Sequence, residues 1–349
     1  MTTTGISQTS MTSWSTLVGH RKIANWFSTA IRQGRLGGSF LLVGSPGIGK
    51  RTVAKLLART LLCDSSDPKE MNPCGKCQAC IQVDAETHPD VVRVSKPADK
   101  SFIPLELLIG PKDARMQAGF CRDLRLKPMA GHRKVAILED ADFLNEEGAN
   151  CLLKTLEEPP PGAVVLVIGT SEQRQLPTIR SRCQILRLGP LSVEDATKLL
   201  REVRHVEATN DQIGDAIEIS GGDMHVAARL LGEHADGLRE ALTAQLNSPH
   251  PDPVALSRII SSHVDDAGKD ASKRRGAMRD VFSISVQHFR RQLRRHAFES
   301  RPDPLAIARL DRSIRAIREV DRSANQATLI ECFASDIAAG TTGDRGEIG

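Results

Sequence analysis

Residues 39–50 read Ser39-Phe-Leu-Leu-Val43 followed without a break by Gly44-Ser-Pro-Gly-Ile-Gly-Lys50. The apolar run predicts a buried β-strand, and the residues after Lys50 repeat their apolar positions at helical spacing. A glycine-rich loop between a strand and a helix turns backbone N–H groups towards a phosphate, and the helix dipole adds to this attraction. The alternative is a glycine-rich turn that arose by chance. We expect four residues of this loop to bind a nucleotide, namely Gly44, Gly47, Gly49 and Lys50.

Four more apolar runs resemble the first in length and composition. They lie at Val91–Val94, Lys134–Leu138, Ala163–Ile168 and Gln184–Leu188. Nearly continuous apolar strands separated by helical segments are typical of a parallel sheet with helices on both faces. We therefore predict an α/β fold with a parallel sheet for residues 14–188.

The pattern changes after residue 188. Gly189-Pro-Leu-Ser192 interrupts it, and Ser192 followed by Asp195 predicts a helix N-cap with an acidic first turn. Beyond this point the segments are helical, with breaks near Pro249–Pro253 and Pro302–Pro304. We predict a small helical domain at 189–237, a second helical domain at 238–339, and disordered tails at 1–13 and 340–349.

Position 51 departs from the usual phosphate loop. A serine or threonine normally follows the lysine, and its hydroxyl binds Mg²⁺. Arg51 stands there instead, and its guanidinium is expected to repel a divalent cation. Thr52 cannot replace the hydroxyl, because one helical step turns a side chain by about 100°. We place both residues at the nucleotide site, where ATP or ADP binding stays open, Mg²⁺ binding is disfavoured and hydrolysis is weak or absent.

An acidic pair follows the apolar run Lys134–Leu138. Glu139 and Asp140 stand where a strand gives way to carboxylates, the arrangement that holds a metal ion and orients water in P-loop enzymes. The order is Glu then Asp, which changes the reach of each carboxylate by one methylene. We assign both residues to the nucleotide site; the alternative is an acidic helix N-cap after a strand.

Four of the eight cysteines form a C-x10-C-x2-C-x2-C pattern at Cys63, Cys74, Cys77 and Cys80. The short spacings let thiolates converge on one tetrahedral Zn²⁺, and four thiolates leave no position open for water. We therefore predict a structural zinc site. An iron–sulfur cluster is the alternative, although the fourth cysteine lies upstream and no Cys-Pro follows. We expect the cysteines at 121, 151 and 332 to be buried or half-buried small hydrophobic residues.

Two later segments are specific to a known family. They read Asn150-Cys-Leu-Leu-Lys-Thr-Leu-Glu-Glu-Pro-Pro160 and Leu176-Pro-Thr-Ile-Arg-Ser-Arg-Cys183. With the phosphate loop and the cysteine pattern, they resemble the AAA+ subunits of the bacterial DNA polymerase III clamp loader over residues 14–235. The resemblance implies an AAA+ P-loop domain with an inserted zinc module, a helical lid and an all-α collar domain. It also places Val18 and Gly19 beside the adenine and Thr170 or Ser171 at the sensor-1 position.

Within that family the chain is more similar to the delta-prime branch than to the tau/gamma motors. Arg51, the Glu-Asp order, and His225 in place of the motors' sensor arginine all favour a poor or inactive ATPase. The resemblance implies a stator that supplies Arg182 as an arginine finger to a neighbouring subunit. A surface arginine without that role is the alternative.

The resemblance also implies partners. They are the delta and tau/gamma subunits of the clamp loader, and through the complex the sliding clamp and primed DNA. Two alternatives remain for the function: an active motor ATPase of the tau/gamma type, and a zinc-dependent nucleic-acid binder.

The amino-acid composition limits the classes of binding partner that the chain can have. Of the 349 residues, 40% are hydrophobic, which can supply real cores, and the formal net charge of +4 is only mildly basic. Aromatic residues make up 3%, which argues against a base-stacking platform. No apolar run approaches the roughly 18 residues that span a membrane, so we expect no membrane partner and a cytoplasmic location. We interpret the basic run Phe289–Arg295 as a solvated helix face or partner contact, with DNA phosphates as the alternative.

Overall fold

The computed structural model describes residues 13–97, 99–130, 133–203, 206–232, 235–298, 303–321 and 324–340. The chain divides between residues 205 and 206 into two compact units, and each is described by itself. Most of the two predicted tails, 1–12 and 341–349, lies outside the described residues. Among the residues in these ranges, no helix has the length and apolar character needed to cross a membrane.

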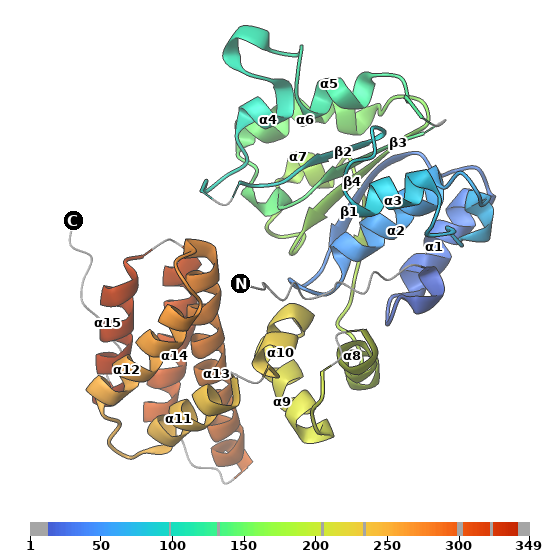
Figure 1. Ribbon diagram of the computed structural model, residues 1–349. Coiled ribbons are helices and arrows are strands. Elements are labelled where there is room, and N and C mark those ends of the chain that lie inside the picture. Colours follow the sequence, from blue (N-terminus) through green and yellow to red (C-terminus); the bar gives the residue numbers. More distant parts are fainter. Residues whose placement is uncertain are drawn as a thin grey trace. The chain divides into compact units, whose positions relative to one another are not determined.

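The first unit is built on a five-stranded parallel sheet (Figure 1). Its strand order is β2-β3-β4-β1-β5, and each strand lies within one residue of a predicted apolar run. The fold predicted from the sequence is therefore confirmed. The strands are β1 (Gly38–Val43), β2 (Val91–Val94), β3 (Lys134–Leu138), β4 (Ala163–Gly169) and β5 (Gln184–Arg187).

The parallel arrangement brings distant segments to one edge of the sheet. In β1, Val43 lies opposite Gly169 of β4 and Arg187 of β5. The phosphate loop follows β1, the acidic pair follows β3 and Thr170 follows β4. Since the carboxyl ends of parallel strands share an edge, these three predicted parts of the nucleotide site meet there.

Helices cover both faces of the sheet (Figure 1), as the apolar strands require. Ser192 caps α8 by accepting a hydrogen bond from the backbone N–H of Asp195 at 3.0 Å, as its sequence predicts. A π-helical turn at Leu199–Val203 continues α8. The helices are α1 (Arg21–Arg32), α2 (Lys50–Leu62), α3 (Gln78–Asp84), α4 (Leu105–Ile109), α5 (Phe120–Arg125), α6 (Glu146–Glu157), α7 (Pro177–Arg180) and α8 (Val193–Lys198).

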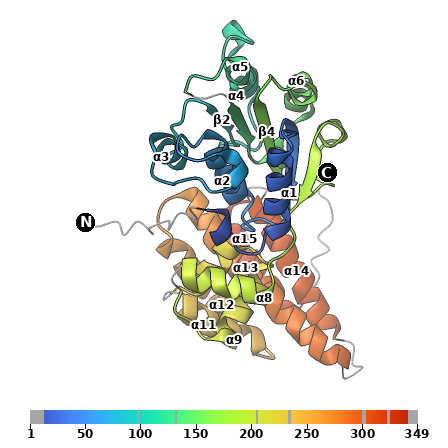
Figure 2. The same cartoon turned by 90° about the vertical axis from the view of Figure 1, so that its right-hand side faces the viewer.

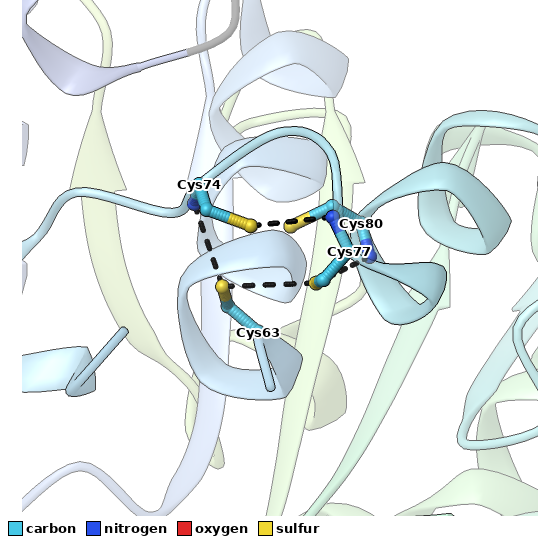
Figure 3. A group of neighbouring side chains, drawn as sticks. All are labelled: Cys63, Cys74, Cys77 and Cys80. Carbon is cyan, nitrogen blue, oxygen red and sulfur yellow. Dashed lines mark hydrogen bonds between the residues drawn. The ribbon is translucent and has the colours of Figure 1, made fainter. Parts of the chain in front are cut away.

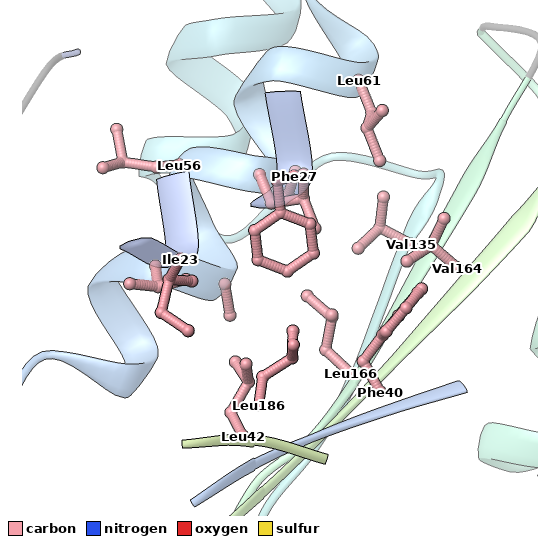
Figure 4. Packing of buried hydrophobic residues seen from close by; sticks show 14 of the residues in the cluster. Ile23, Phe27, Phe40, Leu42, Leu56, Leu61, Val135, Val164, Leu166 and Leu186 are labelled. Atoms are coloured by element: carbon pink, nitrogen blue, oxygen red, sulfur yellow. The ribbon is translucent and has the colours of Figure 1, made fainter. Parts of the chain in front are cut away.

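Each face of the sheet has its own hydrophobic core. On one face α1 and α2 bury apolar side chains against the strands, and Phe27 points from α1 towards Phe40 and Leu166 (Figure 4). On the other face, side chains of α4, α5 and α6 pack on alternate residues of the same strands. Burial on both faces explains why β1, β3 and β4 read as continuous apolar runs rather than alternating ones.

Among the described residues of the second unit, helices are the only regular secondary structure. Helices α13 and α14 lie side by side (Figure 2), and Phe282 of α13 stacks on Phe333 of α15 at 4.7 Å between ring centroids. The first predicted break lies between the end of α11 at Asn247 and the start of α12 at Pro253. In the second, α14 begins at Pro304, and residues 299–302 lie outside the described ranges. The helices are α9 (Asn210–Ser220), α10 (Met224–Leu230), α11 (Ala235–Asn247), α12 (Pro253–Asp266), α13 (Ala271–Phe298), α14 (Pro304–Asp321) and α15 (Gln326–Ala339). The division into lid and collar domains stays a prediction.

One expectation about the scattered cysteines is wrong. Cys121 is buried and Cys151 half-buried, but Cys332 is exposed. Helix α15 buries Leu329, Ile330, Phe333 and Ile337. Cys332 does not belong to this stripe, so the helix turns it towards the solvent instead.

Candidate nucleotide and metal sites

The four predicted ligands of the cysteine module converge in space. All their sulfur atoms lie within 4.8 Å of one another, and they point towards a common centre (Figure 3). The Sγ atoms of Cys63 and Cys77 are 3.9 Å apart. Tetrahedral coordination with Zn–S bonds near 2.3 Å requires sulfur–sulfur distances of about 3.8 Å. The four thiolates are therefore grouped closely enough for one ion to draw them into tetrahedral coordination.

Local backbone structure explains how the module is placed. Cys63 ends α2, which starts at the phosphate loop, while Cys77 caps α3 and Cys80 lies one turn inside it. The knuckle between Cys74 and Cys77 needs a left-handed residue, and Gly75 supplies it with φ of 72°. Backbone N–H groups of Cys74, Cys77 and Cys80 donate to the sulfur atoms of Cys63, Cys74 and Cys77 at 3.3–3.4 Å.

These N–H groups also favour metal binding. Hydrogen bonds from the backbone N–H groups of Lys76 and Cys77 lower the pKa of the Cys74 thiol to about 6. Cys80 is the exception, since burial raises its pKa to about 12. A bound cation offsets that cost by holding the thiolate form. His88 is not a member of the group: its buried Nδ1 accepts a hydrogen bond from the Asp90 backbone at 3.0 Å.

The phosphate loop has the predicted shape. Gly47 and Gly49 adopt left-handed conformations with φ of 67° and 107°, and α2 begins at Lys50. A side chain at Gly44 would meet the carbonyl oxygen of Leu188 at 2.5 Å, so only glycine fits there. The ammonium of Lys50 lies inside the loop, where it donates to the carbonyl oxygens of Gly44 and Ser45 at 2.6 and 2.7 Å.

Arg51 contacts the acidic pair directly. Its Nε lies 2.7 Å from Oε2 of Glu139, and its terminal nitrogen lies 3.4 Å from Oδ1 of Asp140. Both carboxylates come from the turn after β3. The contact between Arg51 and Asp140 therefore joins residues that are 89 positions apart in the sequence. The sequence predicts that the Arg51 guanidinium repels Mg²⁺. The structure places this guanidinium on the two carboxylates that were predicted to hold the metal.

Glu139 has a second arginine partner. The side chain of Arg93, at the end of β2, donates to Oε1 of Glu139 through Nε at 3.0 Å and approaches it through a terminal nitrogen at 2.8 Å. The Glu139 side chain is 4% exposed, and burial raises its pKa against the opposing effect of Arg51 and Arg93. A buried carboxylate held by two guanidinium groups has little capacity left to bind a divalent ion.

Thr170 is held by a residue that the sequence reading did not select. Its backbone N–H donates to both carboxylate oxygens of Asp142 at 3.1 and 2.9 Å, and the Gln175 amide also contacts Asp142. The hydroxyl of Thr170 is buried and, within the described part of the chain, has no hydrogen-bond partner. The third carboxylate of Glu139-Asp-Ala-Asp142 was the only sequence signal for this contact.

The segment predicted to lie beside the adenine contacts the phosphate loop through His20. The ring of His20 is buried, and its Nε2 lies 2.7 Å from the carbonyl oxygen of Ile48. Gly19 has φ of 82°, and a Cβ there would meet Leu191 at 2.2 Å. Val18 and Thr52 are both half-buried. All the predicted nucleotide residues therefore belong to one region of the first unit.

Arg182 lies in a short turn between α7 and β5. Its Nε donates to Oε1 of Glu157 at 2.7 Å, and its terminal nitrogen donates to Thr178 O and Ser181 Oγ at 3.1 Å. The side chain as a whole is 28% exposed. Glu157 lies at the end of α6, and the sequence reading did not identify it as a partner of Arg182.

Comparison with known sequences assigns this chain to a protein family. A sequence profile described as DNA polymerase III, delta subunit, matches residues 19–192. DNA polymerase III subunit delta' of Pseudomonas aeruginosa is 37% identical over 210 residues, which cover 58% of this chain and 57% of that protein. The chain belongs to the DNA polymerase III delta-prime family.

Other DNA polymerase III subunits are more distant from this delta-prime family member. The delta' subunit of Escherichia coli is 27% identical over 273 residues, covering 75% of this chain and 78% of that protein. A gamma subunit of Buchnera aphidicola is 27% identical over 228 residues, covering 64% and 58% respectively. The chain thus spans little more than half the length of the P. aeruginosa and Buchnera relatives that it matches.

Proposed function

We propose that this chain is a stator subunit of a DNA polymerase III clamp loader. In this role it assembles with delta and tau/gamma subunits in the cytoplasm and helps load the sliding clamp onto primed DNA. The observation that carries the proposal is the contact between Arg51 and the acidic pair. A guanidinium on these carboxylates disfavours Mg²⁺, and P-loop hydrolysis depends on that ion. The chain's own ATPase is therefore weak or absent.

The second part of the proposal concerns Arg182. A guanidinium supplied in trans neutralises charge on the transferring γ-phosphoryl group of a neighbouring ATP. Glu157 and the backbone of α7 hold Arg182 at its Nε and one terminal nitrogen, which fixes the direction of the side chain. An arginine oriented before assembly loses less conformational entropy when it meets a phosphate. Glu157 is accordingly a positioning residue for Arg182.

The test is ATP hydrolysis by the reconstituted complex. Arg182→Ala in this chain, combined with delta and tau/gamma subunits, is expected to lower the DNA-stimulated ATPase rate by at least about tenfold. Complex formation, measured by native mass, should be unchanged, because Arg182 is expected to act on the nucleotide rather than to hold the subunits together.

Arg180→Ala is the matched control. Arg180 is an exposed arginine two residues away on α7 that donates to the Glu172 carbonyl at 3.5 Å. Its loss removes the same charge two residues away from Arg182 and should leave the rate within about twofold, since surface charges that contact no ligand contribute little. An ATPase rate that Arg182→Ala leaves unchanged would refute the finger assignment.

A motor ATPase of the tau/gamma type is the second candidate. It is favoured by the intact loop geometry around Lys50 and by the match to a gamma subunit. This reading predicts Mg²⁺-dependent ATP turnover by the isolated chain, abolished by Lys50→Ala. The stator proposal predicts no turnover above background in either protein.

Zinc is the metal that we propose for the cysteine module. Four converging thiolates suit Zn²⁺, and with all four bound no position is left for a substrate. The ion would tie Cys63, at the end of α2, to α3 and the loop before it. Its role is therefore to support the helix that starts at the phosphate loop.

A further inference from the structure

The helical second unit contains a cavity of about 480 Å³. Four helices line it: α9, α11, α13 and α14, together with the loop after α11. Small-molecule sites typically occupy about 300–1,000 Å³. The cavity is therefore large enough for a ligand and lies wholly within one unit.

Positive charge dominates the lining. Four arginines face the cavity, against one aspartate, Asp215. Asp215 already pairs with Arg291 at 2.8 Å, and Glu218 reinforces this pair at 3.0 Å. The other three arginines come from three different helices: Arg239 from α11, Arg295 from α13 and Arg309 from α14.

The arrangement separates the basic run Phe289–Arg295 into two parts. Arg291 and Arg294 are held by carboxylates of α9. Arg295 is exposed at the cavity and forms no ion pair with any described residue. Arg309 is 5% exposed, and burial lowers its pKa while its Nε donates to the Ile337 carbonyl at 2.9 Å. Like charges converging on a partly buried space repel one another unless an anion lies between them.

Two buried polar groups also point to a missing partner. Gln287 is 5% exposed, yet its Oε1 has no hydrogen-bond partner among the described residues. Nε2 of His288 is likewise buried and unpartnered in this part of the chain. Both residues line the cavity. Buried polar atoms normally have partners, so these two indicate a group that binds here.

We propose that this cavity is a binding site for a small phosphorylated ligand, held by Arg295, Arg309 and the ring of His288. Arginine donors suit phosphate oxygens, and a protonated imidazole adds a further donor. Apolar side chains of Ile219, Leu246 and Ile284 line the remainder of the cavity and suit the non-phosphate part of the ligand. A free ligand fits a space of this size between helices better than the backbone of a nucleic acid, which needs an open groove. The proposal is independent of the stator function.

Pyrophosphate is the probe, titrated into the full chain by calorimetry. The phosphate loop could also bind it, so the titration uses the Lys50→Ala variant. One pyrophosphate should bind, and Arg295→Ala or His288→Gln should each weaken binding by about tenfold, the effect of losing one charged hydrogen bond. Should Lys50→Ala fail to fold, each of the two pocket variants in the otherwise native chain must weaken one of the binding events by about tenfold and leave the other unchanged.

Arg290→Ala is the matched control, because Arg290 is exposed on the same helix and does not line the cavity. Its affinity should stay within about twofold of the parent. No binding to the Lys50→Ala variant, or equal losses with Arg290→Ala and Arg295→Ala, would overturn the proposal. Displacement of pyrophosphate by duplex DNA but not by ADP would assign the phosphate to a nucleic-acid backbone, and would overturn the choice of a free ligand.

Affinity should also depend on pH through His288. Burial lowers the pKa of His288, and the nearby charges of Arg295, Arg309 and Arg291 lower it further. A hydrogen bond with the backbone of Leu246 raises the pKa and opposes these effects. Asp215 is the only acidic residue among those that line the cavity. A bound anion favours the charged ring, so binding should take up a proton and strengthen as pH falls from 8 to 6. Phosphate groups also protonate near pH 6, so the pH dependence of affinity is compared with that of His288→Gln. The part of the increase in affinity that comes from His288 should be absent in this variant. An identical pH dependence in the two proteins would exclude His288 from the site.

Discussion

The cysteine module and the nucleotide site both follow from short motifs, but they reach different end states. In the module, four sulfur atoms lie within 4.8 Å of one another, arranged as a metal requires. In the nucleotide site, the loop around Lys50 has its expected shape, but the carboxylates opposite it are bound to Arg51 and Arg93. The cysteine module is arranged to bind a metal cation. The acidic pair of the nucleotide site is already occupied by the guanidinium groups of Arg51 and Arg93.

The difference lies in the length of the side chains involved. Cysteine has one rotatable bond between backbone and sulfur, so the backbone turns at Gly75 and α3 nearly fix the thiolates. Arginine reaches several ångströms further and adapts to whatever carboxylate lies near. A motif therefore specifies a cysteine site closely, whereas an arginine at a known position still has several possible partners.

Removal of the metal is expected to have the largest effect. Cys77→Ser takes one of four ligands, so the zinc content should fall from one ion per chain towards zero. Structural zinc supports folding directly, and we expect the unfolding free energy to fall by about 4 kcal/mol or more. Atomic absorption measures the zinc, and chemical denaturation measures the stability.

Cys332→Ser is the control for this change, since Cys332 is an exposed cysteine outside the module. It should retain zinc and stability. If Cys77→Ser keeps a full equivalent of zinc, or a purified chain contains iron and labile sulfide instead, the module is not the zinc site argued above, and the contrast between the two sites weakens.

Freeing the acidic pair should have the next largest effect. Arg51→Thr restores the hydroxyl that binds Mg²⁺ in other P-loops and releases one of the two guanidinium groups on Glu139. Mg²⁺ should then raise ADP affinity by about tenfold, against less than about twofold in the native chain. Fluorescence titration with a labelled ADP, with and without a chelator, measures the ratio.

Arg51→Met separates the two causes. It removes the cation without supplying a hydroxyl, so Mg²⁺ should have less effect on ADP affinity than in Arg51→Thr. A native chain whose ADP affinity already rises tenfold with Mg²⁺ would show that Arg51 does not occupy the metal position in solution.

The sequence predicts β1, β3 and β4 closely because each is an apolar run that is buried on both faces. The more exposed outer strands β2 and β5 are predicted from shorter β-rich runs. The sequence also predicts the cysteine ligands and the loop glycines, since these depend on spacing within a few residues. It does not predict the partners of Arg51 or Arg182. Glu139 and Glu157 lie 88 and 25 positions away, and only the packing of β3 and α6 brings them near.

The cavity in the second unit is even harder to predict from the sequence. The run Phe289–Arg295 reads as one basic face, yet α9 holds Arg291 and Arg294 while Arg295 faces the cavity. Arg239 and Arg309 come from other helices and carry no motif. Tertiary packing alone brings these arginines together, so no linear pattern could have predicted the site.

The smallest predicted effect is on the pH dependence of stability and concerns Glu139, the carboxylate that contacts both arginines in the nucleotide site. Burial raises the pKa of this carboxyl above its ordinary value of 4.5. A carboxyl with a higher pKa in the folded state binds its proton more tightly there, so its stabilising contribution is full at low pH and is lost as pH rises through the folded-state pKa. The native chain should therefore lose stability relative to Glu139→Gln as pH rises from about 4 towards 7, by less than the effect of losing zinc. Urea unfolding at several pH values measures the difference. A difference that grows in the opposite direction would mean that Arg51 and Arg93 outweigh burial, and that the acidic pair is held as a charged pair more firmly than its burial implies.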